Sequence, residues 1–255
     1  MLWIESFFVA LSTYSALPAP QFEWNERNMK YALCFFPAVG LFCGGGLFGW
    51  YALCSVVGAS DFFFAAGAVC LPLLITGGIH MDGYIDTVDA LSSHQPRERK
   101  LEILKDSHCG AFAVIYCGVY LLLSLGLFYE LAGRPGAIAA LCPLYCFSRA
   151  LSGICAVRLP NARKNGMLSA YTQSAEKRAT AAVLAVVAAL SGAAALLLAP
   201  LPGVGAVLAG LGAMVFYRRM ALAQFGGVTG DTSGFFLQIC ELACMAGAWA
   251  GGLFV

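Results

Sequence analysis

Residues 179–199 read ATAAVLAVVAALSGAAALLLA, without a single charged side chain. An α-helix of this length rises about 30 Å, which matches the hydrocarbon core of a lipid bilayer. In lipid, only helices or closed barrels satisfy their own backbone hydrogen bonds, and the alternation typical of barrel strands is absent. Comparable apolar runs, rich in Ala, Gly, Leu and Val, occupy residues 33–57, 61–79, 110–131, 137–157, 203–217 and 233–255. We therefore expect an all-α, polytopic membrane protein with about seven transmembrane helices.

The composition supports this expectation. Of the 255 residues, 60% are hydrophobic and 11% charged, with a mean hydropathy of +0.78, whereas soluble domains carry about 25% charged residues. We expect residues 1–255 to form a single integral membrane domain with the lipid bilayer as its solvent. The net charge of +1 and the lack of a basic stripe argue against a nucleic-acid partner.

The N-terminal segment and the cysteines fit the same class of protein. The segment MLWIESFFVALSTYSALPAP is apolar but short, and Glu5 interrupts it. It lacks the basic start and cleavage site of a signal peptide, so we expect an interfacial or re-entrant segment. The eleven cysteines form no C-x-x-C pair and lie mostly in apolar runs, which favours small buried hydrophobic side chains over disulfides or zinc sites.

Charged residues gather in alternate connections between the runs. Arg and Lys number 2, 0, 4, 1, 5, 0 and 2 in connections 18–32, 58–60, 80–109, 132–136, 158–178, 200–202 and 218–232. The positive-inside rule places the first, third, fifth and seventh connections on the cytoplasmic side. Ten acidic residues lie in the same four connections, although any exposed loop collects charges of both signs. We expect a multi-pass protein of the cytoplasmic (inner) membrane with its active face toward the cytoplasm.

The stretch G78-I-H-M-D-G-Y-I-D-T-V-D-A-L91 contains three aspartates, Asp82, Asp86 and Asp89. On a helix this spacing places the three carboxylates on one face, where they repel one another. A divalent cation such as Mg²⁺ or Mn²⁺ relieves that repulsion, so we predict a metal site, with a solvated helix face as the alternative. His80 is a candidate substrate-binding residue, or else a structural one.

The stretch R97-E-R-K-L-E-I-L-K-D-S-H-C-G-A-F112 brings cations close to the aspartates in sequence. A metal beside Arg or Lys is typical of phosphoryl transfer. Lys105 is a candidate catalytic cation. Asp106 is a candidate metal ligand or base for an attacking hydroxyl, or simply the N-cap of the following helix.

Three further polar features lie in or beside the later runs. Arg149 sits deep in an apolar run, which indicates a role near an anion or a structural pair with the intramembrane Glu241. Arg163, in the loop after that run, is a candidate phosphate clamp. The loop F225-G-G-V-T-G-D-T-S-G234 has glycines, notably Gly227 and Gly230, whose N–H groups can approach an anion, while Asp231 can reach a metal.

Together these stretches resemble the cobalamin synthase family, also called adenosylcobinamide-GDP ribazoletransferase or cobalamin-5′-phosphate synthase. The resemblance covers essentially the whole chain. It rests on residues 78–91 and 97–112, on S148-R149 with A162-R-K-N-G-M167, and on G226-G-V-T-G-D231 followed by Glu241. This chain has His108 where the family usually has Arg after Asp-Ser.

The resemblance implies an Mg²⁺-dependent transferase for the last assembly step of cobalamin biosynthesis. It implies adenosylcobinamide-GDP and α-ribazole or its 5′-phosphate as substrates, with GMP as the leaving group, and a homo-oligomer is compatible with it. Asp82, Asp86 and Asp89 would then hold metal, Lys105, Arg149 and Arg163 would offset phosphoryl charge, and Asp106 or Asp231 would act on the hydroxyl.

Two other classes of function compete with this interpretation. CDP-alcohol phosphotransferases share the Asp-Gly start and spaced aspartates, but Asp82-Gly83 is followed here by Asp86-Thr87 and their later aspartate motif is missing. A transporter would place Arg149 and Glu241 along a path near the midplane, often with repeated halves. This sequence has no evident repeat, and most of its polar residues lie on one side.

Overall fold

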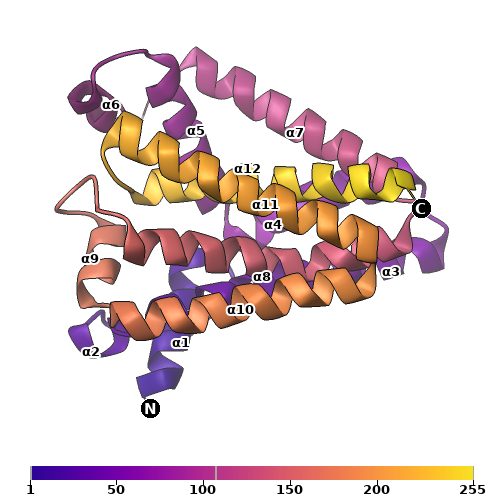
Figure 1. Cartoon of the computed structure of the whole chain (residues 1–255), viewed down its shortest axis with the longest axis horizontal. Coiled ribbons are helices and arrows are strands. Elements are labelled where there is room, and N and C mark those ends of the chain that lie inside the picture. Colours follow the sequence, from indigo (N-terminus) through magenta and orange to yellow (C-terminus); the bar gives the residue numbers. More distant parts are fainter. Residues whose placement is uncertain (1, 107, 255) are drawn as a thin grey trace.

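The computed structural model describes residues 2–106 and 108–254, which are almost entirely helical (Figure 1). The elements are α1 (Leu2–Tyr14), α2 (Glu26–Met29), η1 (Ala32–Phe35), α3 (Phe36–Val57), α4 (Asp61–Thr76), α5 (Ile79–Ser92), α6 (Arg97–Ile103), α7 (Ala111–Leu131), α8 (Pro135–Arg158), α9 (Met167–Ser174), α10 (Lys177–Leu198), α11 (Pro200–Met220), η2 (Ala221–Phe225), α12 (Gly230–Gly251) and η3 (Gly252–Phe254).

Within the described residues, six helices are long and apolar enough to cross a membrane. They cover residues 32–57, 111–131, 135–158, 177–198, 200–225 and 230–254. Each contains most or all of one predicted run, so the all-α, multi-pass architecture is confirmed. The eleven cysteines are free thiols, and most of them are buried or partly buried.

The remaining predicted run, residues 61–79, forms a broken element. Helix α4 ends at Thr76, and Gly77 and Gly78 follow with φ angles of 64° and 77°, a left-handed conformation that glycine adopts without a steric penalty. Helix α5 then leaves at 96° to α4. The two helices together count as a seventh span at most, and the break turns the aspartate-bearing helix across the direction of the bundle (Figure 1).

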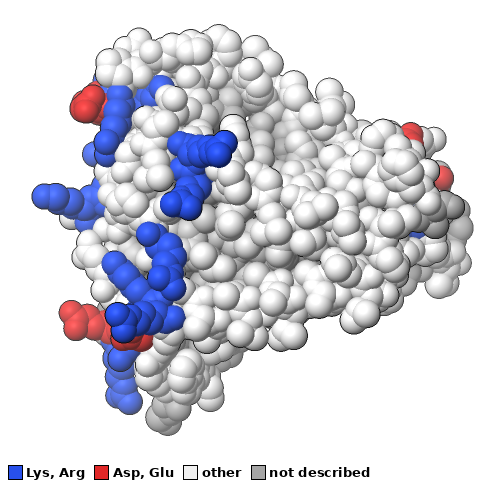
Figure 2. Space-filling model, in the orientation of Figure 1, with Lys and Arg blue, Asp and Glu red and all other residues white. Residues whose placement is uncertain are grey.

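The four charge-rich connections meet at one end of the molecule. Helices α2, α6 and α9 and the connection between α11 and α12 lie on the left in Figure 1, opposite the turns that join α3 to α4, α7 to α8 and α10 to α11. Figure 2 shows most of the visible Lys and Arg side chains at that left end. The grouping of alternate connections inferred from the sequence is therefore present in the fold.

Helix α8 forms the centre of the bundle, packed against α3, α10 and α12. Small residues on α3 allow the closest of these approaches. A Cβ added to Gly40 or Gly44 would lie 2.5 Å from the Tyr145 carbonyl oxygen or 2.2 Å from that of Cys142. Such close backbone packing through glycine is a common way for membrane helices to associate.

A buried ion pair joins α8 to α12. The Arg149 guanidinium, 1% exposed, donates to the carboxylate of Glu241, to Ser148 Oγ at 3.0 Å and to the Tyr145 carbonyl at 3.2 Å. Ser148 Oγ also donates to Glu241 at 3.2 Å. Of the two roles that the sequence left open for Arg149, the structure shows the pair with Glu241.

Truncating Glu241 to Ala should therefore destabilise the bundle by about 3–5 kcal/mol, because it leaves Arg149 as an uncompensated buried charge. The double variant Arg149→Met, Glu241→Leu should recover much of that loss, since it removes both charges. Chemical unfolding in detergent micelles measures both effects. A double variant no more stable than Glu241→Ala would show that the unpaired charge is not the cause of the loss.

Candidate active site

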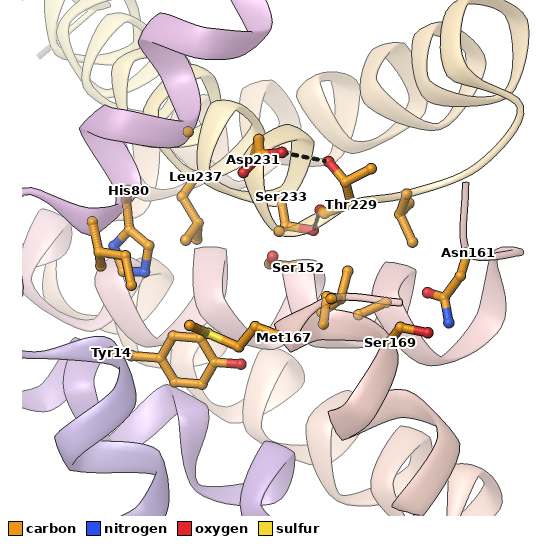
Figure 3. Close-up of a pocket in the computed structure, with 18 of the residues that line it drawn as sticks. Tyr14, His80, Ser152, Asn161, Met167, Ser169, Thr229, Asp231, Ser233 and Leu237 are labelled. Atoms are coloured by element: carbon orange, nitrogen blue, oxygen red, sulfur yellow. Dashed lines mark hydrogen bonds between the residues drawn. The ribbon is translucent and has the colours of Figure 1, made fainter. Parts of the chain in front are cut away.

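A cavity of about 320 Å³ opens near the charged end of the bundle. Its walls come from α1, α3, α5, α8, the loop before α9 and the start of α12. Figure 3 shows Asp231, Ser233 and Thr229 on one side and Tyr14 and Met167 on the other. His80 lies toward one end of the cavity and Asn161 toward the opposite end (Figure 3). The wall contributed by α12 is polar, and the end near Tyr14 is aromatic.

Two glycines place the aspartates of α5 and α12 beside the same cavity. A Cβ on Gly83 would lie 2.7 Å from the Asp231 carbonyl oxygen, and one on Gly234 would lie 2.8 Å from that of His80. The two backbones can touch only because neither position carries a side chain. As a result, Asp82 and Asp231, which are 149 residues apart in the chain, both line the cavity.

The loop before α12 pairs with the loop after α8. The Ala162 N–H donates to the Val228 carbonyl at 2.9 Å, and the Val228 N–H donates to Pro160 at 2.8 Å. Gly227 makes this possible, since a Cβ there would lie 2.2 Å from the Pro160 carbonyl oxygen. Its N–H donates to the Ala221 carbonyl at 3.1 Å. The Gly227 N–H is thus occupied by a backbone carbonyl and its missing side chain serves loop packing, while substrate binding by Gly227 stays a prediction.

Gly230 fits its predicted place. It is the first residue of α12, it lines the cavity, and nothing lies within 4 Å of where its Cβ would be. Thr229 caps this helix by accepting from the Thr232 N–H at 3.1 Å. The N-terminus of a helix attracts anions through its free N–H groups and its dipole. This wall of the cavity is therefore suited to a phosphate group.

Arg163 brings a positive charge to the same wall. Its guanidinium donates to Asp231 Oδ2 at 3.2 Å and to the Leu101 carbonyl of α6 at 2.9 Å. The Nε of Arg163 is buried and has no hydrogen-bond partner among residues 2–106 and 108–254. Arg163 therefore orients Asp231 and places a positive charge at the wall of the cavity, while its substrate-binding role stays a prediction.

The three aspartates of α5 do not converge on one point. Asp82 and Asp89 are two helical turns apart, a rise of about 10 Å. The Asp89 carboxylate packs against Gly110, where an added Cβ would lie 2.1 Å from its oxygen. In the described part of the chain, no group of three or more His, Cys, Asp or Glu residues is placed to hold a metal ion. Asp82 and Asp231 line the cavity and Asp86 lies within the electrostatic influence of both, while metal binding by Asp82, Asp86 and Asp89 stays a prediction.

Lys105 and Asp106 lie outside this cavity, in the exposed turn before α7. Asp106 accepts from the His108 N–H at 3.0 Å and contacts His108 Nδ1 at 2.6 Å. The backbone N–H of His108, and then its side chain, lower the pKa of Asp106. The N-cap of α7 is Gly110, so Asp106 does not have the capping role considered from the sequence.

His80 lines the cavity. Arg149 does not line it, although Ser152, one helical turn further along α8, does. Sequence reasoning did not propose Tyr14, Ser152 or Asn161, which also line it. Tyr14 belongs to the apolar N-terminal segment, which the sequence alone does not connect with a site. Neither Ser152 nor Asn161 carries a sequence signal that separates it from its neighbours.

The fold defines a multi-pass membrane protein with a partly polar cavity near its charged end. The family model described as cobalamin-5-phosphate synthase matches residues 6–249. This chain belongs to that family.

Curated relatives support the same assignment. The chain is 42% identical to an adenosylcobinamide-GDP ribazoletransferase of Lachnoclostridium phytofermentans, over 97% of this chain and 93% of the relative. It is 33% identical to a protein of the same name from Pseudomonas entomophila, over 94% of this chain and 97% of that one. No solved structure matches the chain.

The glycine crossing of α5 and α12 makes a sharp prediction. Gly234→Ala places a methyl group 2.8 Å from the His80 carbonyl, so the helices must separate and move Asp82 away from Asp231. A displacement of about 1 Å in such a site can cost a hundredfold in turnover. Gly118→Ala on α7, where nothing lies within 4 Å, is the matched control. Initial rates with purified protein compare them, and equal activity of both variants would contradict this role.

Proposed function

We propose that this protein is an adenosylcobinamide-GDP ribazoletransferase. A hydroxyl oxygen of α-ribazole, or of its 5′-phosphate, attacks the phosphorus next to the cobinamide arm of adenosylcobinamide-GDP. A new P–O bond forms, the bond to the GMP phosphate oxygen breaks, and the hydroxyl proton leaves to a base. The observation that carries the proposal is that Asp82, Asp231 and Arg163 meet in one cavity of a chain that belongs to this family.

The residues of the cavity suit this reaction. Arg163 and the N-terminus of α12 face a region where diphosphate oxygens would gain negative charge, and preorganised donors of this kind lower the barrier to phosphoryl transfer. Asp231 is our first candidate to accept the hydroxyl proton, because it lines the cavity and its orientation is set by Arg163 and by Thr229 Oγ1 at 3.4 Å. Asp106 is the second candidate and would have to be brought in from its exposed turn.

The cavity also fits Mg²⁺ as a cofactor. Mg²⁺ commonly uses one or two protein carboxylates, with water and substrate phosphates completing its six ligands, so a cage of three aspartates is not needed. Asp82 would be its protein ligand, with Asp86 and Asp231 close enough to add to the negative field. When bound, the ion would neutralise the diphosphate and favour departure of GMP.

The orientation follows from the charge distribution. We place the charged end of the bundle at the cytoplasmic face of the cytoplasmic membrane, because it carries most of the Lys and Arg residues. Both substrates are large and polar and would reach the cavity from the cytosol without crossing the bilayer.

Of the competing interpretations, family membership favours the ribazoletransferase over a CDP-alcohol phosphotransferase. The transporter interpretation relied on Arg149 and Glu241 as path-lining groups. They are paired with each other in the packed interior, and this arrangement supports a structural role instead.

Asp82→Asn should lower GMP release by about a hundredfold or more, because it removes a charged group at the reacting phosphates. The assay supplies purified protein in lipid with adenosylcobinamide-GDP, α-ribazole and Mg²⁺. Removing divalent ions with a chelator should abolish release by wild type. Asp89→Asn, whose carboxylate packs against Gly110, is the matched control and should retain most activity. Release of GMP that is insensitive to both treatments would refute the metal proposal.

The two candidate bases can be separated. Asp231→Asn should lose most of the turnover, whereas Asp106→Asn should stay within about a factor of three of wild type, since its carboxylate is exposed and bonded to His108. Single-turnover rates at saturating substrates measure the chemical step for each variant. The reverse ranking would assign the base to Asp106 and imply that its turn closes over the cavity.

A further inference from the structure

One end of the cavity is built from three rings. Tyr14 of α1 and Phe36 of α3 pack with their centroids 4.4 Å apart. The His80 ring lies 6.4 Å from Tyr14 in a near-parallel orientation and 5.8 Å from Phe36. All three residues line the cavity. They form a contiguous aromatic wall, which we call the aromatic end.

A buried, unpartnered polar atom lies in this aromatic end. His80 is 4% exposed, and its Nε2 has no hydrogen-bond partner among the described residues. A buried donor or acceptor left without a partner costs free energy, so such an atom at a cavity wall indicates a partner on the ligand. Figure 3 shows the His80 ring beside Tyr14, at the opposite end of the cavity from Asn161.

The size of the cavity limits which part of the substrates can enter it. A volume of about 320 Å³ is near the lower end of the usual range for small-molecule sites. A nucleoside is of this size, but a corrin ring with its adenosyl group is several times larger. The corrin must therefore remain outside, and one of the two nucleoside portions occupies the cavity.

The chemistry of the aromatic end distinguishes between the two bases. Guanine carries N7 and O6 acceptors and an exocyclic amino donor, which would need several partners when buried. The ring of α-ribazole is a dimethylated benzimidazole with one free nitrogen acceptor and otherwise apolar edges. An aromatic wall with a buried, unpaired imidazole nitrogen matches the second base.

We infer that the aromatic end, formed by Tyr14, Phe36 and His80, is the subsite for the benzimidazole base of α-ribazole, with His80 Nε2 donating to its free ring nitrogen. The inference rests on the proposed function and assigns a substrate to one end of its site. With the base at the aromatic end, the polar wall with Asp231 and Arg163 lies beside the sugar hydroxyl and the diphosphate. His80 then acts as a substrate-selecting residue.

The test separates the KM for α-ribazole from the KM for adenosylcobinamide-GDP. Base–aromatic stacking is worth enough that Phe36→Leu should raise the KM for α-ribazole about tenfold and leave the other KM unchanged. The control is Phe35→Leu, whose ring packs against Trp3 and Phe7 instead of the cavity. The control should keep both KM values.

A substrate analogue tests His80 itself. Wild type should bind an indole-type analogue of α-ribazole, with C–H in place of the free ring nitrogen, about tenfold more weakly than α-ribazole. His80→Phe should lose this preference and show equal KM values for the two, because it keeps the ring and removes the donor. The wild-type measurement stands even if the variant does not fold.

The outcomes are distinct. A rise in the KM for adenosylcobinamide-GDP alone would give the aromatic end to guanine and overturn the inference. Equal KM values for α-ribazole and its analogue in wild type would also overturn it. If wild type released no GMP at all, the proposed function would fail before the subsite was tested.

Discussion

Lipid offers no hydrogen-bond partners to a peptide group, and this constraint governs the whole molecule. The chain can leave helical geometry only at the ends of the bundle or where protein surrounds it. The long helices therefore run without interruption, except where α4 gives way to α5 at Gly77 and Gly78. Irregular backbone collects at the charged end, in the loops before α9 and α12. These loops are free to carry glycines, charges and unpaired polar atoms, and the cavity forms among them.

Glycine serves three different purposes in that region. Gly77 and Gly78 turn the chain between α4 and α5, and Gly83 and Gly234 let α5 and α12 pack in direct contact. Gly227 lets the loop before α12 pack against the loop after α8. Each use depends on the missing side chain. The polar groups act on the ligand, and the glycines determine where those groups lie.

The sequence predicted the fold well because hydrophobicity in a membrane is read one segment at a time. The apolar runs and the alternation of charged connections depend on local composition, and both were recovered.

Asp82, Asp231 and Arg163 were identified for a similar reason, since charges are rare in this chain and each stands out. Spatial arrangement is what the sequence does not predict. A shared helical face suggested that Asp89 joins Asp82, but two turns of rise separate them. The sequence suggested anion binding by Gly227, because the contacts of a glycine cannot be inferred from the sequence alone. Tyr14 and Ser152 could not have been found, because their place beside the cavity depends on contacts between distant segments.

The shortness of α4 has a consequence for the membrane itself. Its 16 residues rise about 24 Å, roughly one helical turn less than the hydrocarbon core of a bilayer. Measured from Asp61, a helix of this length stops short of the opposite headgroups of an unperturbed bilayer, and α5 turns aside at that point. A bilayer either thins around such a short helix or leaves the cavity at the start of α5 below the level of its lipid phosphates. The thickness of the host membrane thereby becomes one of the determinants of how readily water and substrate reach Asp82.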